Sequence, residues 1–284
     1  MTSANITANR VRPLTLVGIY AVLVTGALLV LGPFILSVMT SLKTPQQLAT
    51  ESKLALPWPL TLENFERLFS GEIVDFSRSI LVTAGYVGIV IVCQLVFSIL
   101  AAYAFARLNF PGRDALFWVY LSTLMVPAVV TIIPLYLMVS ELGLRNTFWG
   151  LVLPYLFGSP YAIFLLREYF RGIPQELVDA ARIDGAGNWL ILIRIILPLS
   201  RPIIATLGII TAVTHWNNFM WPLIITSGPE WSVITTSTAS VQTQFNGNWT
   251  IVMAATTLAL LPLILLFVAF NKQIVSSIAI TSFR

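Results

Sequence analysis

Six long apolar segments dominate this sequence of 284 residues. Crossing a hydrocarbon core about 30 Å thick takes roughly 20 helical residues, and each of the six runs comes near that length. A backbone that faces lipid must satisfy its own hydrogen bonds, and the runs lack the alternating pattern of barrel strands. The sequence therefore predicts an all-α, polytopic membrane protein with six transmembrane helices, near residues 14–39, 80–106, 115–139, 147–166, 195–216 and 250–270.

The composition agrees with a chain that faces lipid. Hydrophobic residues make up 57% of the sequence and charged residues only 10%, whereas a soluble domain carries about 25% charged residues. Cys93 is the only cysteine, so a disulfide framework within the chain and a multi-cysteine metal site are both excluded. We expect Cys93 to behave as a small buried hydrophobic residue.

The distribution of charge predicts the orientation. If both termini lie in the cytoplasm, eleven of the sixteen lysine and arginine residues fall on the cytoplasmic side, in agreement with the positive-inside rule. We therefore expect an N-in, C-in topology with a cytoplasmic tail at residues 1–13 and one membrane domain over residues 14–284. The same bias accounts for the net charge of +4 without a nucleic-acid partner.

The cytoplasmic loop over residues 172–198 carries the clearest local pattern. Pro174 suits the first turn of a helix, and Glu176 and Asp179 fall in the first two turns, where the helix dipole favours acids. Gly185 can end this helix because glycine adopts the left-handed conformation. The spacing i, i+3, i+4, i+7 places four residues on one face, which we expect to be exposed for a partner protein: Leu177, Ala180, Ala181 and Asp184. A helix lying on lipid is the alternative, but its acids make that interpretation less suitable.

The loop resembles a known signature. The run Asp179-Ala180-Ala181, three residues, Gly185, nine residues and Ile195-x-Leu197-Pro198 is similar to the EAA motif of ABC importer permeases. In that family the loop forms a coupling helix that inserts into a cleft of a separate ATPase, and aspartate here replaces the usual first glutamate. The resemblance implies an ATPase-docking site at Glu176, Leu177, Asp179, Ala180, Ala181, Asp184 and Gly185.

Further segments resemble the maltose-type carbohydrate permeases, in particular their MalG-like subunit. These segments are Ala101–Arg107, Phe110–Arg113, Ile133–Tyr136, Leu142–Thr147 and Trp216–Phe219. The resemblance implies the type I ABC importer permease fold in a prokaryotic plasma membrane and transport by alternating access. MalG-like proteins often end in a glycine-rich tail, which this chain lacks, so the loop over 172–198 is expected to be its main contact with the ATPase.

The resemblance also implies partners: a second, MalF-like permease subunit, two copies of a cytoplasmic nucleotide-binding ATPase, an extracytoplasmic solute-binding protein and a sugar-like substrate. The sequence contains no Gly-x-x-x-x-Gly-Lys-Ser/Thr phosphate loop. We therefore expect ATP and Mg²⁺ to be bound by the partner subunits. No cofactor, metal site or enzyme activity is expected in this chain, and its remaining contact is membrane lipid.

Polar residues within the spans are candidates for the substrate pathway, because they cost free energy unless they face a cavity or a partner. Neutral amides and hydroxyls suit the hydroxyl groups of a sugar. The alternative for each is a hydrogen bond between helices, and for the only histidine it is a hydrogen bond at a helix end. The candidates are Gln94, Ser122, Thr123, His215, Trp216, Asn217 and Asn218.

Two extracytoplasmic segments stand apart from the spans. Residues 44–77 contain Leu60–Phe69, whose leucines and phenylalanines predict a short helix on the membrane or on the partner permease. Residues 222–248 form a long, polar, almost uncharged segment, which we expect to be a loop that contacts the solute-binding protein.

Two other functions require sequence patterns that differ from this one. An ion-coupled secondary transporter needs charged residues inside its spans, and a membrane enzyme needs clustered nucleophiles, acids or metal ligands. Neither pattern occurs in the predicted spans. An ABC permease for a solute other than a sugar is a further alternative, since the sequence does not distinguish among disaccharides, oligosaccharides, polyols and glycerol phosphates.

Overall fold

The computed structural model describes residues 13–71, 74–245 and 247–281, and within these ranges all regular structure is helical. The α-helices are α1 (Pro13–Ser41), α2 (Pro45–Thr50), α3 (Glu63–Phe69), α4 (Phe76–Arg107), α5 (Arg113–Ser122), α6 (Ala128–Glu141), α7 (Phe148–Val152), α8 (Pro160–Arg171), α9 (Gln175–Ile183), α10 (Asn188–Ile191), α11 (Leu197–Leu199), α12 (Arg201–Trp216), α13 (Met220–Ile225), α14 (Ile234–Gln244) and α15 (Trp249–Thr281). The predicted all-α class is confirmed. Most of the predicted N-terminal tail and residues 282–284 lie outside the described residues.

Four stretches of the described chain are long and apolar enough to cross a membrane, and two bent pairs of helices bring the number to six if each pair is one span. The four are Thr15–Ser41, Phe76–Arg107, Phe148–Arg171 and Trp249–Phe270. The pairs are Arg113–Met125 with Ala128–Glu141, and Asn188–Leu199 with Arg201–Trp216. Each of the six predicted segments therefore falls on one of these stretches or pairs.

The predicted third span is bent rather than continuous. The helical stretch that ends at Met125 meets α6 at an angle of 101°. Pro127 explains the bend, because proline lacks a backbone N–H and favours an extended residue before it, and Val126 is extended with φ −82° and ψ 117°. The predicted third span near residues 115–139 is therefore divided at Pro127 into two helical stretches.

The predicted fifth span is bent near its start. The segment that ends at Leu199 meets α12 at an angle of 78°, so residues 195–199 lie in the helical stretch before the bend. Pro202 lies in the first turn of α12, where its missing N–H costs nothing but prevents the preceding helix from continuing. The 16 residues of α12 give a helix about 24 Å long.

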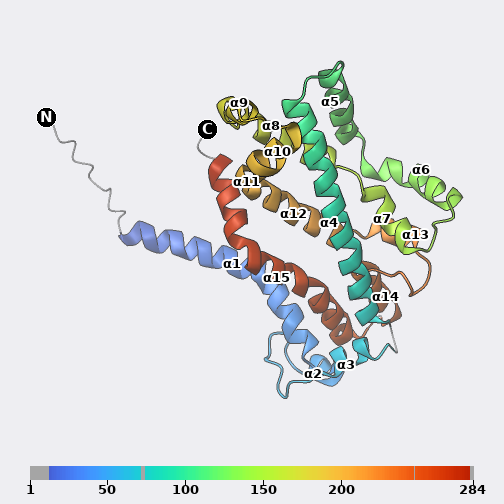
Figure 1. The fold of residues 1–284 in the computed structure, drawn as a ribbon. Helices are drawn as coiled ribbons and strands as arrows, with labels where there is room; N and C mark the ends of the chain where they lie inside the picture. Colours follow the sequence, from blue (N-terminus) through green and yellow to red (C-terminus); the bar gives the residue numbers. More distant parts are fainter. Residues whose placement is uncertain (1–12, 72–73, 246, 282–284) are drawn as a thin grey trace.

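The helix α4 runs the length of the molecule and packs against α8 and α12, and α15 packs against α1 and α12. The C-terminal end of α4 and the helix α9 lie at one end of the molecule, which we call the α9 end, and α2, α3 and α14 lie at the opposite end (Figure 1). Two clusters of buried side chains follow this division. One surrounds Tyr86 and Trp221, and the other, at the α9 end, surrounds Leu166 and Phe170.

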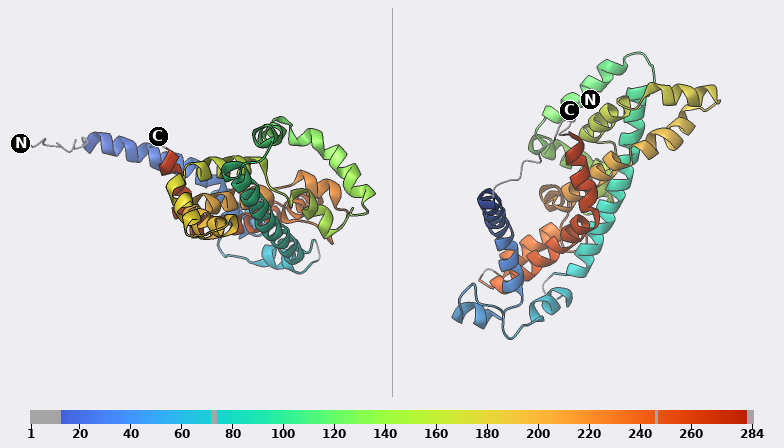
Figure 2. Two further views of the ribbon diagram at one scale, coloured as in Figure 1. Left: turned by 45° about the horizontal axis from the view of Figure 1, so that its top comes forward. Right: turned by 90° about the vertical axis from the view of Figure 1, so that its left-hand side faces the viewer.

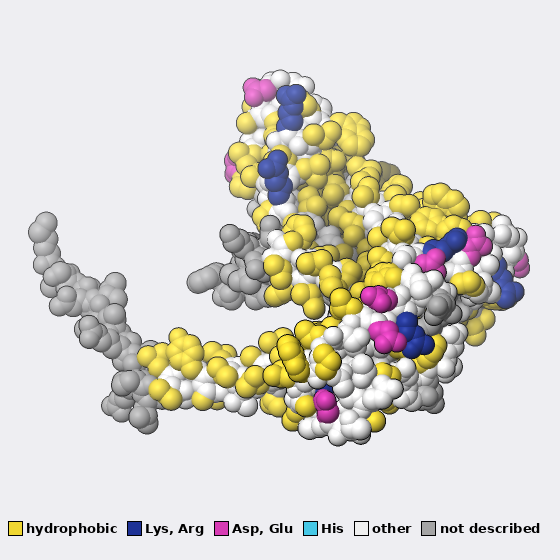
Figure 3. Space-filling view, turned by 90° about the horizontal axis from the view of Figure 1, so that it is seen from below, with side chains coloured by type: hydrophobic (Ala, Val, Ile, Leu, Met, Phe, Trp, Pro, Cys, Tyr) yellow, Lys and Arg dark blue, Asp and Glu magenta, His cyan; other side chains and the backbone are white. Residues whose placement is uncertain are grey.

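Much of α1 extends away from the other helices, as the three ribbon views show (Figures 1 and 2). Its side chains are almost all exposed and apolar, including Val17, Val22 and Leu29. Seen in the space-filling view, hydrophobic side chains cover this projecting helix (Figure 3). A helix that is apolar on all sides is stable in lipid or against another apolar surface rather than in water.

The two segments outside the predicted spans, residues 44–77 and 222–248, both contain helices. The short helix predicted within residues 60–69 is present as α3, with Asn64 and Leu68 buried. The loop predicted over residues 222–248 is wrong in part, since α14 occupies its second half and packs against α15 and α4. The sequence of α14 shows no apolar helical period, because serine and threonine also occupy its buried face. Their hydroxyls bond within the helix or to α4, as in the pair Ser79–Ser237 at 2.7 Å.

Candidate functional site

The helix α9 forms where the sequence predicts it. Pro174 is extended and precedes the first helical residue, Gln175. Gly185 follows the last turn with φ +83°, a left-handed conformation that favours glycine. The amide of Ala186 closes the turn by donating to the Ala181 carbonyl at 2.8 Å. Pro174 and Gly185 therefore fix the two ends of α9.

One side of α9 faces the other helices. Val178 is only 1% exposed, and the half-buried Ala181 packs with it against the cluster at the α9 end. Residues three apart on a helix share a face, so the burial of Val178 carries Ala181 inward. The prediction that Ala181 lies on the exposed face is therefore wrong. The other predicted docking residues are exposed: Glu176, Leu177, Asp179, Ala180, Asp184 and Gly185.

The opposite side of α9 presents an isoleucine that the sequence analysis missed. Ile183 is 87% exposed, the largest exposure given for a large hydrophobic side chain among the described residues. It follows Glu176 and Ala180 at helical spacing, which is the signal that could have identified it. We call Glu176, Leu177, Ala180, Ile183 and Asp184 the docking face. An apolar patch bordered by acids, outside the apolar spans, suits contact with another protein.

Arg107, the last residue of α4, fastens α9 to the spanning helices. Its guanidinium donates to the carbonyl of Ile173 at 2.6 Å, to the carbonyl of Phe170 and to the side chain of Gln175. Gln175 in turn donates to the Asp179 carboxylate at 3.0 Å. The bond to Gln175 and the burial of Val178 therefore hold α9 itself, and the bonds to Phe170 and Ile173 hold the end of α8 and the connection that leads into α9.

A polar cluster lies among the spanning helices. Tyr86 Oη is 2.9 Å from His215 Nδ1, and Asn218 Nδ2 donates to the hydroxyls of Tyr86 at 3.3 Å and Tyr155 at 3.2 Å. Gln94 joins this group by donating to the Tyr155 carbonyl at 3.4 Å. We call these five residues the polar cluster; it holds three of the predicted pathway residues and two tyrosines that the sequence analysis missed. A buried tyrosine hydroxyl requires a hydrogen-bond partner. Tyrosines within the apolar segments were therefore the signal that could have identified these two residues.

The other predicted pathway residues do not join the polar cluster. Trp216 is buried and its indole donates to the Ala259 carbonyl at 3.0 Å, which ties α12 to α15. Asn217 is exposed and bonds back to Val213 within its own helix. Ser122 and Thr123 are exposed at the bend after α5, and their hydroxyls donate to carbonyls three residues earlier. These four residues have structural partners rather than a common cavity.

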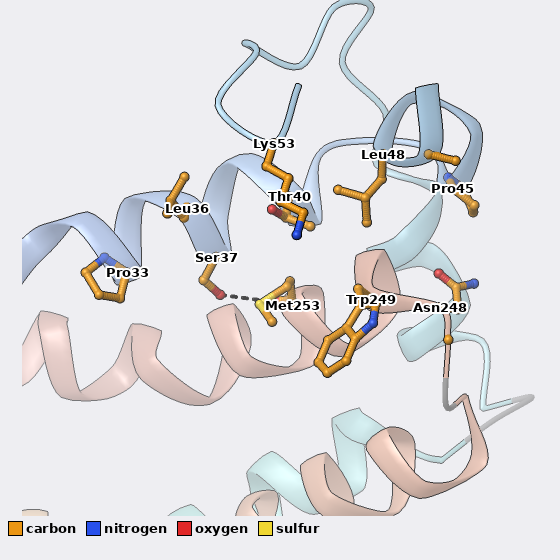
Figure 4. A pocket seen from close by; sticks show the side chains of 12 residues that line it. Pro33, Leu36, Ser37, Thr40, Pro45, Leu48, Lys53, Asn248, Trp249 and Met253 are labelled. Carbon is orange, nitrogen blue, oxygen red and sulfur yellow. Dashed lines mark hydrogen bonds between the residues drawn. The ribbon is translucent and has the colours of Figure 1, made fainter. Parts of the chain in front are cut away.

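A separate pocket of about 570 Å³ lies at the end opposite α9, between α1, α2 and the start of α15 (Figure 4). Its walls are mainly apolar, with Leu36, Trp249 and Met253 among them, and Lys53 lines it as well. Ser37 donates to the Met253 carbonyl at 3.4 Å and joins two of its sides. None of the predicted site residues lines this pocket.

The model of one protein family, described as binding-protein-dependent transport system inner membrane component, matches residues 94–280, more than half of the chain. The chain belongs to this family. The matched region contains α9, its anchor Arg107 and four of the five residues of the polar cluster. The chain is thus a multi-pass protein of the inner membrane.

Individual relatives agree with the family match. The arabinooligosaccharides transport system permease protein AraQ of Halalkalibacterium halodurans is 32% identical over 227 residues, covering 79% of this chain and 80% of the relative. The sn-glycerol-3-phosphate transport system permease protein UgpE of Brucella suis is 32% identical over 269 residues, covering 92% and 95%. A solved bacterial ABC transporter involved in the import of the acidic polysaccharide alginate matches with a TM-score of 0.79 at 23% identity, covering 92% and 98%.

These findings confirm the resemblance on which the sequence analysis relied. The chain is a permease subunit of an ABC importer, and its relatives include permeases of carbohydrate transport systems. The predicted roles of individual residues in docking and in the substrate pathway remain predictions.

Proposed function

We propose that this permease subunit imports a carbohydrate, or a related polyol or glycerol phosphate, and that α9 is the helix on which a cytoplasmic ATPase acts. The docking face carries the proposal: exposed Ile183 and Leu177 lie beside the acids Glu176 and Asp184 on a helix outside the apolar spans. An ATPase cleft with an apolar floor and basic rim would complement this face in shape and charge.

The proposed mechanism is alternating access. Closure of two ATPases around ATP draws the α9 helices of this chain and of a second permease together. Because Arg107 and Val178 hold α9 against the spanning helices, that movement rotates the helices as a rigid body and reorients the pathway between the two membrane faces. ATP and Mg²⁺ are then bound by the partner subunits, and this chain contributes no catalytic group.

The same proposal fixes the orientation. The α9 end faces the cytoplasm, so both termini lie on that side and α2, α3 and α14 face outward, where a solute-binding protein delivers the substrate. The surplus of lysine and arginine on the α9 side supports this orientation.

A carbohydrate-like substrate is supported by the neutral groups among the spans. The polar cluster offers amides and phenolic hydroxyls from Gln94, Asn218 and two tyrosines, which match the donors and acceptors of a sugar. Lys43 is the only charged side chain among the buried residues of the described chain. Ion coupling across the membrane normally uses buried charges in the spans, so no observation here favours a secondary transporter.

The docking proposal is tested by Ile183→Arg in membrane vesicles that contain the whole transporter and its loaded binding protein. Uptake of labelled maltose, an arabinooligosaccharide and sn-glycerol-3-phosphate first identifies the substrate. Arginine places a charge at the centre of the docking face, so uptake and substrate-stimulated ATP hydrolysis are both expected to be lost while the chain stays in the membrane. Ile183→Val is the control and should retain both activities. Normal uptake by Ile183→Arg contradicts docking through this face. If the transporter takes up none of these three solutes but imports a solute of another class, the proposed substrate is wrong.

A further inference from the structure

A polar cavity separates the C-terminal end of α4 from the coupling region that follows α8. It has a volume of about 640 Å³ and is lined by Arg107, Asn109, Gln175, Arg182 and Asn188, among others. Two of these side chains are guanidinium groups, one from a spanning helix and one from α9. Neither belongs to the docking face, so the proposed contact with the ATPase leaves this cavity without a function.

No acidic side chain of the described residues lines this cavity, although the carboxylate of Asp179 lies close enough to attract Arg107. Three other arginines at the α9 end, Arg113, Arg167 and Arg171, each pair with an acidic side chain. Across the described ranges, neither Arg107 nor Arg182 has such an ion pair. Arg107 also has a buried Nε without a hydrogen-bond partner. Two guanidinium groups facing one polar cavity repel each other, and an anion between them removes that repulsion.

A second cavity adjoins the first. Its volume is about 340 Å³, and it is lined by Leu100, Tyr103, Trp189 and Leu192 together with Leu108 and Asn188, which also line the polar cavity. Trp189 is 66% exposed, which suits the boundary between membrane and water, where tryptophan is enriched. The first cavity is therefore basic and the second is mainly apolar, which suits an amphiphilic ligand.

We propose that the two cavities form one binding site for an anionic phospholipid of the leaflet on the α9 side. Its phosphate binds between Arg107 and Arg182. Arg182 supplies the paired hydrogen bonds to the phosphate oxygens, and Arg107, whose Nη atoms already donate to Phe170, Ile173 and Gln175, contributes its positive charge. An acyl chain lies along Tyr103, Trp189 and Leu192. A net negative headgroup is favoured over a zwitterionic one, because a choline ammonium beside two arginines restores the repulsion that the phosphate relieves.

The site has a consequence for coupling. A phosphate held by both arginines joins α4 to α9, in addition to the direct bonds of Arg107 to Ile173 and Gln175. Bound lipid therefore stiffens the connection through which α9 acts on the spans. Import by the assembled transporter should depend on anionic lipid in the membrane, which is a property beyond the proposed transport function.

The variant Arg182→Gln tests the site. Within the described chain the side chain of Arg182 makes no hydrogen bond or ion pair. Its replacement should therefore leave the fold intact, whereas replacement of Arg107 would release α9. Arg194→Gln is the matched control, because Arg194 is also exposed on the loop but lines neither cavity. Native mass spectrometry of the detergent-purified transporter, titrated with phosphatidylglycerol or with phosphatidylcholine of the same chain length, measures lipid affinity for each variant.

The expected result is specific to one arginine and one headgroup. Arg182→Gln should weaken phosphatidylglycerol binding roughly five- to tenfold and leave phosphatidylcholine binding unchanged. Arg194→Gln should bind both lipids as the unmodified protein does. Equal losses in both variants indicate diffuse attraction to basic residues and overturn the site. Inorganic phosphate provides the last arm: if it binds as tightly as phosphatidylglycerol and with the same dependence on Arg182, the cavity holds a free anion and the lipid assignment is wrong.

Discussion

Asp179 is held by a residue one helical turn before it. Gln175 donates to its carboxylate at 3.0 Å and is itself bonded by Arg107. Side chains four residues apart on a helix are neighbours, so an aspartate completes this chain of hydrogen bonds. The sequence identifies the acid at this position. It cannot identify Arg107 as its distant partner, because no local spacing relates α4 to α9.

Removal of the Asp179 carboxylate should weaken coupling rather than docking. In Asp179→Ala, Gln175 loses the acceptor that orients it toward Arg107, so α9 is held less firmly and less of its movement reaches α4. Substrate-stimulated ATP hydrolysis of the assembled transporter should fall several-fold, with the ATPase still bound. Asp179→Asn keeps an oxygen acceptor for Gln175 and should stay closer to the unmodified protein. Equal and full activity of both variants would show that this carboxylate positions nothing.

At the scale of the element, the sequence predicts where α9 begins and ends but misjudges its rotation. Successive helical residues are turned by about 100°, so Ala181 is only about 60° from Val178 around the axis, whereas Ile183 is about 140° away. Once Val178 is buried, Ala181 must turn inward and Ile183 outward. Which residue of a short amphipathic helix is buried depends on the helices it meets, and the sequence of α9 alone does not contain that information.

The end of α9 offers a test at the same scale. Gly185 has φ +83° and open space around it, and Gly187 has φ −75° and open space as well. A Cβ in the left-handed conformation costs about 1–2 kcal/mol, so Gly185→Ala should loosen the last turn of α9. Hydrogen exchange of the α9 amides is then expected to accelerate roughly fivefold or more.

Gly187→Ala is the control for that comparison, because alanine fits its backbone without strain. Exchange in this variant should match the unmodified protein. Identical exchange in both variants would mean that the left-handed residue does not determine where α9 ends.

At the scale of the whole molecule, hydropathy predicts the number and location of the spans but not their shape. Pro127 and Pro202 mark the bends after α5 and before α12, yet the angles of 101° and 78° depend on the helices that pack around them. The polar cluster is hidden from the sequence for a related reason. Tyr86 lies in α4, His215 in α12 and Tyr155 in the turn between α7 and α8. They meet only because α4 packs against α12 and also against α7 and α8.

Contact between α9 and the ATPase underlies the proposed mechanism, and cysteine crosslinking measures that contact directly. Replacement of Cys93, the only cysteine, by serine gives a background in which a single new cysteine can be placed. Ile183→Cys in the docking face is compared with Leu56→Cys, a residue that is 77% exposed before α3, at the other end of the molecule. In membranes containing the assembled transporter, a photocrosslinker attached through the thiol should join the ATPase to position 183 and not to position 56. Capture of the ATPase at position 56, or its absence at position 183, would contradict the account.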